Sequence, residues 1–294
     1  MSHCRWVRWQ WLPLPSPDAV CLDGSRSGIS YRAAAGGTSP SLKLANKKRW
    51  VLYFQGGGWC HSTADCGLRA LSAMGTNSTT HGSPHVPEGH GIIDPCCSVS
   101  VDFCDYNKVF FHYCDGASFS GGGRQSRLEL EASRQLPASL SRLPRTVHSA
   151  GRAIVTSALQ LLIDRFSLGE ATDVMVAGFS AGGLAALLNA EDIRAALRAA
   201  GAPLQRFKAA SFSGVFLPSV VPTSPLELQL RATFDGARAT GGCAAWLRRL
   251  GLSVGRDAWR CAMDAAPLEM LPASLPVFVA QSTVDWVPQR LGLG

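Results

Sequence analysis

The sequence predicts an α/β fold in which helices cover both faces of a mainly parallel sheet. Strands and amphipathic helices alternate along the chain, and this alternation is typical of that fold class. The expected strands are continuous apolar runs, as in parallel strands that are buried on both faces. They lie at residues 50–55, 107–114, 173–178, 207–214 and 275–281.

The predicted helices lie on either side of the third expected strand in the sequence. In residues 146–166, apolar side chains such as Ile154 and Ala158 fall on one face of a helix with 3.6 residues per turn. A second helical pattern begins just after Ser180 and continues to about Ala200. The two helices are therefore expected to pack directly against the sheet.

Other segments show no regular period. Residues 61–104 are rich in His, Gly, Pro and Cys, and we expect long loops there, held by disulfides. Residues 1–20 are expected to be an irregular N-terminal segment that makes a poor signal peptide, because prolines interrupt its short apolar part. Residues 21–294 are expected to form one domain, and no apolar run reaches the roughly 18 residues of a membrane span.

The chain contains ten cysteines at irregular spacings, without the C-x2-C pairs of zinc sites. Disulfides are the better interpretation, and they indicate an oxidising compartment. Sequence alone does not give the pairing. Our hypotheses are two short-range pairs and one longer pair: Cys60–Cys66, Cys243–Cys261 and Cys21–Cys114.

The formal net charge of +7 favours anionic partners, among them acidic polysaccharides. The cations are scattered along the chain, and no expected helix has a basic stripe with interleaved aromatic side chains. A nucleic-acid partner is therefore not predicted.

A candidate nucleophile follows the expected strand 173–178. The sequence Gly178-Phe179-Ser180-Ala181-Gly182 lies between this strand and a helix, which is the context of a nucleophile elbow. The small residues around the serine permit a sharp turn that lifts the hydroxyl above the carboxyl edge of the sheet. The start of the following helix offers free N–H groups to an anion. Ser180 is the predicted nucleophile.

An acyl-transfer serine also needs donors for the oxyanion of the tetrahedral intermediate. The N–H of Ala181, directly after the serine, is one candidate. A second source is the segment VLYFQGGGWC at residues 51–60, an apolar strand followed by three glycines. Glycine permits backbone angles that aim successive N–H groups at one point.

Four tracts together resemble the pectin acetylesterase family, which includes the Notum-type deacylases. They are CLDGS at 21–25, FQGGGWC at 54–60, YCDGASFSG at 113–121 and GFSAGGLAALLN at 178–189. The likeness extends from about Cys21 to Asp285. It implies an α/β-hydrolase-like fold, a secreted Ser-Asp-His carboxylesterase, and no metal or organic cofactor.

The resemblance also implies roles for single residues. Gly58, Trp59 and Ala181 correspond to the family's oxyanion donors, and Ser180 to its nucleophile. The forms of the tracts at 54–60 and 113–121 resemble plant pectin acetylesterases more than the animal deacylases. Acetylated pectin is therefore the expected substrate. The alternative is a lipid deacylase acting on an acylated protein, which would need a deep apolar pocket.

Asp285 is the expected acidic member of the triad, because it follows the strand 275–281 in the Ser…Asp order of this fold. The family has an Asp-Ser-Trp or similar tract there, whereas Trp286 follows Asp285 directly in this chain. Asp257 and Asp264 are poorer candidates, since they lie in helical or loop-like sequence.

The histidine of the triad is not evident. All seven histidines precede Ser180, whereas the base follows the acid in this fold. We therefore expect the histidine and the C-terminal part of the fold beyond Gly294. His61 is expected to be a loop residue and His112 a sheet residue. Two alternatives stay open, which are an inactive homologue that binds carbohydrate and a nonstandard base.

Overall fold

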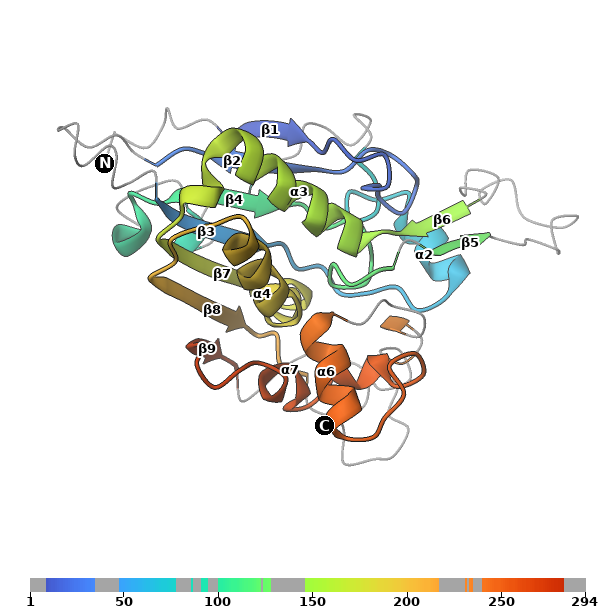
Figure 1. Ribbon diagram of the computed structural model, residues 1–294. Coiled ribbons are helices and arrows are strands. Elements are labelled where there is room, and N and C mark those ends of the chain that lie inside the picture. Colours follow the sequence, from blue (N-terminus) through green and yellow to red (C-terminus); the bar gives the residue numbers. More distant parts are fainter. Residues whose placement is uncertain are drawn as a thin grey trace, which may run out of the picture.

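A seven-stranded sheet forms the centre of the computed structural model, with strand order β1-β2-β4-β3-β7-β8-β9 (Figure 1). The structure describes residues 9–34, 48–77, 86, 91–94, 100–122, 124–127, 146–216, 231, 233–234 and 240–282.

The sheet is mixed but mainly parallel. Strand β2 is antiparallel to both β1 and β4, and the other neighbouring strands are parallel. The strands are β1 (Gln10–Pro13), β2 (Gly28–Arg32), β3 (Arg49–Phe54), β4 (Asn107–Phe111), β7 (Asp173–Phe179), β8 (Arg206–Phe212) and β9 (Val277–Ala280). The strands β5 (Arg124–Arg127) and β6 (Thr146–Ser149) form a separate antiparallel pair.

The five predicted strands correspond to β3, β4, β7, β8 and β9 and are confirmed. The sequence did not predict β1 and β2. Strand β1 has only four residues, includes a proline, and lies within the segment that we expected to be irregular. It forms because β2 offers it a pairing edge from Gly28 to Tyr31, which is a tertiary effect.

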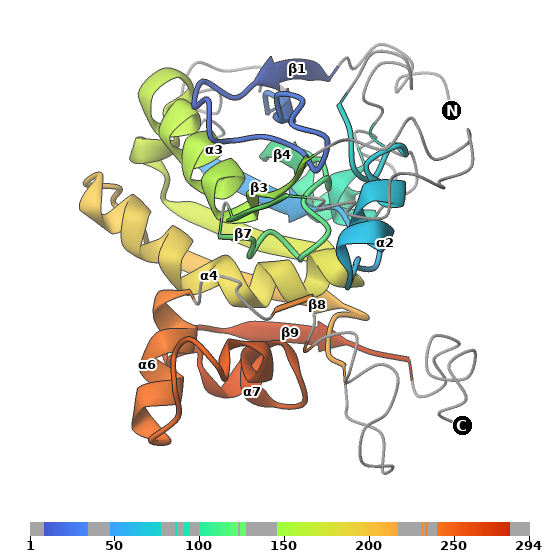
Figure 2. The ribbon, with the colours of Figure 1, turned by 90° about the vertical axis from the view of Figure 1, so that its right-hand side faces the viewer.

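The main helices are α3 (Gly151–Phe166) and α4 (Ala181–Ala199), and the shorter ones are α2 (Thr63–Arg69), α6 (Gly241–Arg249) and α7 (Ala266–Glu269). The 3-10 helices are η2 (Gly91–Ile93), η3 (Val101–Phe103), η5 (Leu168–Glu170) and η6 (Ala258–Ala262). Figure 2 shows α4 lying along β7 and β8, with α6 and α7 close to β9. None of the described helices is long and apolar enough to cross a membrane.

Two sequence expectations were wrong in detail. The helix expected at 146–166 begins only at Gly151, because residues 146–149 pair with β5 as a strand. The expectation of loops throughout 61–104 fails at α2. This helix is capped by the Ser62 hydroxyl, which accepts a hydrogen bond from the Asp65 N–H at 3.1 Å.

The two faces of the sheet are covered differently. On one face, buried side chains of α3 and α4 such as Ile154 and Leu184 pack against Leu52 and Phe54 of β3. On the other face, Ile93 of η2 belongs to a second apolar cluster. Among the described residues, α3 and α4 thus cover the first face, and the 3-10 helices η2 and η3 lie on the second.

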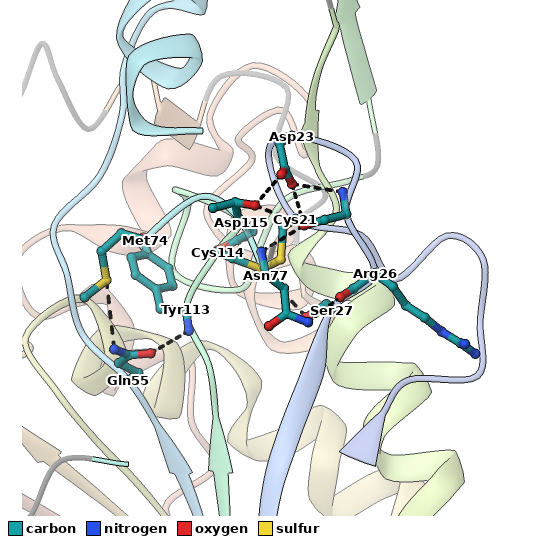
Figure 3. Close-up of a disulfide and its surroundings, with 12 residues drawn as sticks. Cys21, Asp23, Arg26, Ser27, Gln55, Met74, Asn77, Tyr113, Cys114 and Asp115 are labelled. Carbon is teal, nitrogen blue, oxygen red and sulfur yellow. Dashed lines mark hydrogen bonds between the residues drawn. A yellow bond between two sulfur atoms is a disulfide. The ribbon is translucent and has the colours of Figure 1, made fainter. Parts of the chain in front are cut away.

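The three proposed disulfides are confirmed. Their sequence separations are 93 for Cys21–Cys114, 6 for Cys60–Cys66 and 18 for Cys243–Cys261. All seven cysteines in the described part of the chain are disulfide-bonded, and Cys4, Cys96 and Cys97 lie outside it. Figure 3 shows that Cys21–Cys114 joins the segment before β2 to the segment after β4.

The Cys21–Cys114 disulfide should stabilise the fold more than the Cys243–Cys261 disulfide. Because it closes a loop of 93 residues, its removal in a Cys21→Ser/Cys114→Ser variant should lower the free energy of unfolding by about 4.6 kcal/mol. The matched variant Cys243→Ser/Cys261→Ser opens a loop of 18 residues and should cost about 3 kcal/mol. Urea unfolding of the two variants gives the comparison, and an inverted order would contradict this expectation.

Candidate active site

Ser180 lies at the turn between β7 and α4, with backbone angles φ 56° and ψ −126°. A positive φ is unfavourable for a residue with a side chain and persists only where the surroundings enforce it. Its N–H donates to the Phe212 carbonyl at 2.8 Å, and its carbonyl accepts from the Leu184 N–H at 3.1 Å. The predicted strand-turn-helix is confirmed, and the catalytic role of Ser180 stays a prediction.

Two glycines allow the chain to turn this sharply. A Cβ atom on Gly178 would lie 2.2 Å from the Gly182 carbonyl oxygen. A Cβ atom on Gly182 would lie 2.1 Å from the carbonyl oxygen of Phe54 in the neighbouring strand. The end of β7, the first turn of α4 and the end of β3 therefore pack backbone against backbone. Any side chain at these two positions would force them apart.

The glycine-rich loop after β3 lies against this turn. Strands β3 and β7 are parallel neighbours with Phe54 opposite Gly178, so their carboxyl ends meet at one edge. A Cβ atom on Gly56 would lie 3.2 Å from the Cβ of Ser180. Gly58 has a φ of +67°, and no atom lies within 4 Å of the position of its missing Cβ. The loop therefore lies beside Ser180 at Gly56, and open space adjoins it at Gly58.

Three backbone N–H groups at this edge have no hydrogen-bond acceptor within the described part of the chain. They belong to Gly58, Trp59 and Ala181. Ala181 is the first residue of α4, where N–H groups have no partner inside the helix. The structure therefore brings the predicted donors to the same edge as Ser180, as an oxyanion hole requires.

Behind the loop lies Tyr113, which is completely buried. Its hydroxyl donates to the Gly58 carbonyl at 2.7 Å and accepts from the Ser118 N–H at 3.0 Å. Burial raises the pKa of the Tyr113 phenol, so the hydroxyl keeps its proton and remains a donor. The Tyr113 N–H in turn donates to the Gln55 Oε1 at 2.9 Å (Figure 3).

Asp115 holds the next turn of the same segment. Its carboxylate is buried and accepts the N–H groups of Ala117, Phe119 and Gly121 at 3.3, 3.1 and 3.3 Å. Burial raises the pKa of this carboxyl group, and the three N–H donors oppose that rise. The turn presents Ser118, whose Oγ accepts from the indole Nε1 of Trp59 at 2.8 Å.

The three candidates for the acidic member of the triad, Asp257, Asp264 and Asp285, differ in their surroundings or lie outside the described residues. The Asp257 carboxylate accepts hydrogen bonds from the Arg260 Nε at 3.1 Å and from the Ser253 N–H at 3.0 Å. The bond from Arg260 is the main cause that lowers the pKa of the Asp257 carboxyl group, and the bond from Ser253 is the second. This is a local loop arrangement. Asp264 sits in a turn with a φ of 55°. Asp285, the expected triad member, lies outside the described residues.

The described histidines do not contact Ser180. His112 directly follows β4, which ends at Phe111, so the expectation of a residue inside the strand is wrong by one position; its Nε2 lies 2.8 Å from the Ser30 Oγ while its ring meets Trp11 edge-on. His61 is an exposed loop residue, as predicted, with Nδ1 at 3.0 Å from Asp65 Oδ2. The remaining described histidine, His148, belongs to β6. The others, at 3, 81, 85 and 90, lie outside the described residues.

A groove of about 590 Å³ runs beside the elbow. Phe179, Phe212, Tyr53 and Ile92 are among its apolar lining residues, and Ser213 and Ala280 also line it. The groove lies on the side of the sheet opposite α4, since Phe212 packs against the second apolar cluster rather than the helical one. It offers apolar space within one residue of the candidate nucleophile.

A family model described as pectinacetylesterase matches residues 10–289. The chain belongs to the pectinacetylesterase family. Pectin acetylesterase 5 of Arabidopsis thaliana is 32% identical over 176 residues, which are 60% of this chain and 35% of that protein. The palmitoleoyl-protein carboxylesterase NOTUM of Mus musculus is 26% identical over 204 residues, with 69% and 35% covered.

A solved structure supports the fold of this pectinacetylesterase-family chain. The Wnt deacylase Notum from Drosophila matches with a TM-score of 0.74 and 21% identity, covering 96% of this chain and 73% of that one. The α/β-hydrolase-like fold is therefore confirmed. The chain matches about a third of the length of the curated relatives named above, at 35% of each.

Sequence reasoning missed the residues that support the glycine loop. Tyr113 and Asp115 belong to the tract that carried the family resemblance, but no role was assigned to them. Arg69 was not singled out at all, although it donates to the Gly57 carbonyl at 2.7 Å. Asp115 precedes Gly116, but Arg69 and Tyr113 have no glycine beside them, so no local signal in the sequence indicated their contact partners.

The close backbone packing at the elbow predicts a sharp difference between two glycines. Gly178→Ala should lower the free energy of unfolding by about 3 kcal/mol, because its methyl group meets backbone that cannot move aside. Gly169→Ala is the matched control, since its Cβ would meet its nearest atom at an ordinary 3.5 Å. Urea unfolding measures both, and equal effects would show that the elbow tolerates a side chain.

Proposed function

We propose that the protein is a secreted serine carboxylesterase that removes acetyl groups from pectin through an acyl-enzyme. The observation that carries this proposal is the strained conformation of Ser180 at the β7–α4 turn, at the same edge as three N–H groups that have no acceptor within the described residues. Strain of this kind is stored at functional sites, and here it lifts a hydroxyl to the edge of the sheet. Family membership supports the same reaction class.

In the proposed mechanism, the Ser180 Oγ attacks the ester carbonyl carbon and its proton passes to a general base. The N–H groups of Gly58, Trp59 and Ala181 receive the oxyanion that forms. Collapse of the tetrahedral intermediate breaks the ester bond, releases the sugar hydroxyl with the proton from the base, and leaves acetyl-Ser180. Water then attacks the acyl-enzyme and frees acetate.

The other triad members are part of the proposal. Asp285 would orient a histidine and stabilise its protonated form. The resemblance implies a histidine that follows Asp285, and none of the described histidines bonds to Ser180. The disulfides are consistent with export to an oxidising compartment, as expected for a cell-wall enzyme.

The substrate class follows from the relatives and from charge. The plant relatives at 32% and 29% identity are both pectin acetylesterases. Pectin is a polyanion, and a chain with a formal net charge of +7 attracts it at long range. An acetyl group is small, so its ester needs no deep pocket beside Ser180.

Removal of the nucleophile tests the reaction class. In the full-length protein, Ser180→Ala should lower kcat for acetate release from acetylated pectin by roughly 10⁶-fold, because no acyl-enzyme can form. Ser274→Ala, an exposed serine, should leave kcat unchanged. Acetate release and p-nitrophenyl acetate hydrolysis measure both variants. Pectin binding without any Ser180-dependent turnover would reject the esterase and favour the carbohydrate-binding alternative.

The groove beside the elbow favours a second candidate, which is hydrolysis of longer acyl esters. Phe179 and Phe212 give this groove apolar walls, and one relative of the chain is a palmitoleoyl-protein carboxylesterase. The two functions differ in their dependence on acyl length.

Comparison of p-nitrophenyl acetate with p-nitrophenyl octanoate separates them. An acetylesterase should have a higher kcat/KM for p-nitrophenyl acetate than for p-nitrophenyl octanoate. Phe212→Ala should leave its kcat/KM for p-nitrophenyl acetate unchanged. For a long-chain deacylase, octanoate should be preferred, and the same variant should lower its kcat/KM about tenfold through lost apolar burial. The acetate preference is our expected result.

A further inference from the structure

We propose that Arg69 and Tyr113 are positioning residues that orient the oxyanion hole. The inference rests on the proposed esterase function and deepens it. Both side chains bind carbonyl groups of the glycine loop, at Gly57 and Gly58, and neither has been placed among the groups that touch the ester.

The geometry of the peptide group links these bonds to the catalytic donors. In a trans peptide, the C=O and the following N–H point in opposite directions, and every described peptide bond is trans. The Arg69 Nη2 holds the Gly57 oxygen at 2.7 Å, so the N–H of Gly58 points away from Arg69. One peptide plane of the loop is thereby fixed.

Tyr113 does the same for the next peptide. Its hydroxyl holds the Gly58 oxygen at 2.7 Å, so the N–H of Trp59 points away from Tyr113. Within the described residues, both N–H groups have no acceptor, whereas both carbonyls have a donor. The two bonds sort the loop into a carbonyl side bound by protein and an N–H side left for substrate.

The two positioning side chains are themselves held in place. The Arg69 Nε donates to the Met74 carbonyl at 3.2 Å, and its guanidinium lies 5.2 Å from the centre of the Tyr113 ring. Arg69 is the last residue of α2, and the Cys60–Cys66 disulfide ties that helix to the loop. Tyr113 is buried and also bonded to Ser118.

This support is needed because glycine is the most flexible residue. Three successive glycines at 56–58 would otherwise sample many orientations of their peptide planes. An oxyanion hole is effective when its donors are already aimed before charge develops, since no reorganisation is then required during the reaction. Loss of either carbonyl anchor should therefore slow the chemical step more than it weakens substrate binding.

Tyr113→Phe is the sharpest test, because it removes only the hydroxyl. In the full-length protein it should lower kcat for p-nitrophenyl acetate about tenfold and leave KM within twofold. Arg69→Met should have a similar effect. Arg69→Lys should retain part of the rate, since a lysine keeps a charged donor but cannot reach the Gly57 and Met74 carbonyls with separate nitrogens.

Two matched controls lie at the opposite end of the sheet. Tyr31→Phe removes a hydroxyl that donates to the Asn107 Oδ1 at 3.1 Å. Arg49→Met removes a guanidinium that lies 5.3 Å from the Tyr106 ring centre and binds Asp105. Both should keep kcat within twofold of the wild-type value, although Tyr31→Phe loses a hydroxyl hydrogen bond and Arg49→Met loses an ion pair and a cation–π contact.

The affinity for a trifluoromethyl ketone inhibitor separates a positioning role from a purely structural one, which would leave this affinity unchanged. The adduct of this inhibitor with Ser180 bears an oxyanion, so Tyr113→Phe should weaken its binding by the same factor as it lowers kcat/KM. Unchanged kcat and inhibitor affinity, or a loss explained by a lower Tm and shared by Tyr31→Phe, would overturn the proposal. Failure of the esterase function itself looks different, because the wild-type protein would then show no Ser180-dependent turnover.

Discussion

The close approach of backbone to backbone at the carboxyl ends of β3 and β7 is the constraint on which the site depends. Gly178 and Gly182 leave no room for a Cβ atom against each other and against Phe54. This contact brings the start of α4 beside the end of β3 and forces Ser180 into its positive φ. The serine hydroxyl, the first N–H of the helix and the glycine loop are together only because no side chain separates them.

Buried polar groups then hold the loop in one conformation. Tyr113 and Asp115 are inside the protein, where an unpaired polar group would be costly, so each is surrounded by partners. Gly151, the first residue of α3, also packs closely on the Asp115 carboxylate, since a Cβ there would lie 2.0 Å from Oδ2. The loop is thereby connected to a main helix of the fold as well as to the Cys21–Cys114 disulfide.

The relatives of this chain are named for esters of different size. Pectin acetylesterases and palmitoleoyl-protein carboxylesterases share recognisable sequence with it. In the proposed mechanism the nucleophile and the oxyanion donors see only the ester carbonyl, which is identical in both substrates. Discrimination must therefore come from the walls around the site, where the groove beside Phe179 and Phe212 is the described feature of suitable size.

The sequence by itself determined the strand-turn-helix around Ser180 and five strands of the sheet. These features depend on local patterns, such as apolar runs and glycine spacing, whereas the three disulfide pairs were only hypotheses until the structure paired the cysteines. Tertiary structure decided the rest. Strand β1 exists because β2 offers it an edge, and residues 146–149 are a strand because β5 pairs with them. The roles of Arg69 and Tyr113 depend on contacts across 12 and 55 residues, and no local pattern encodes which carbonyl a distant side chain will reach.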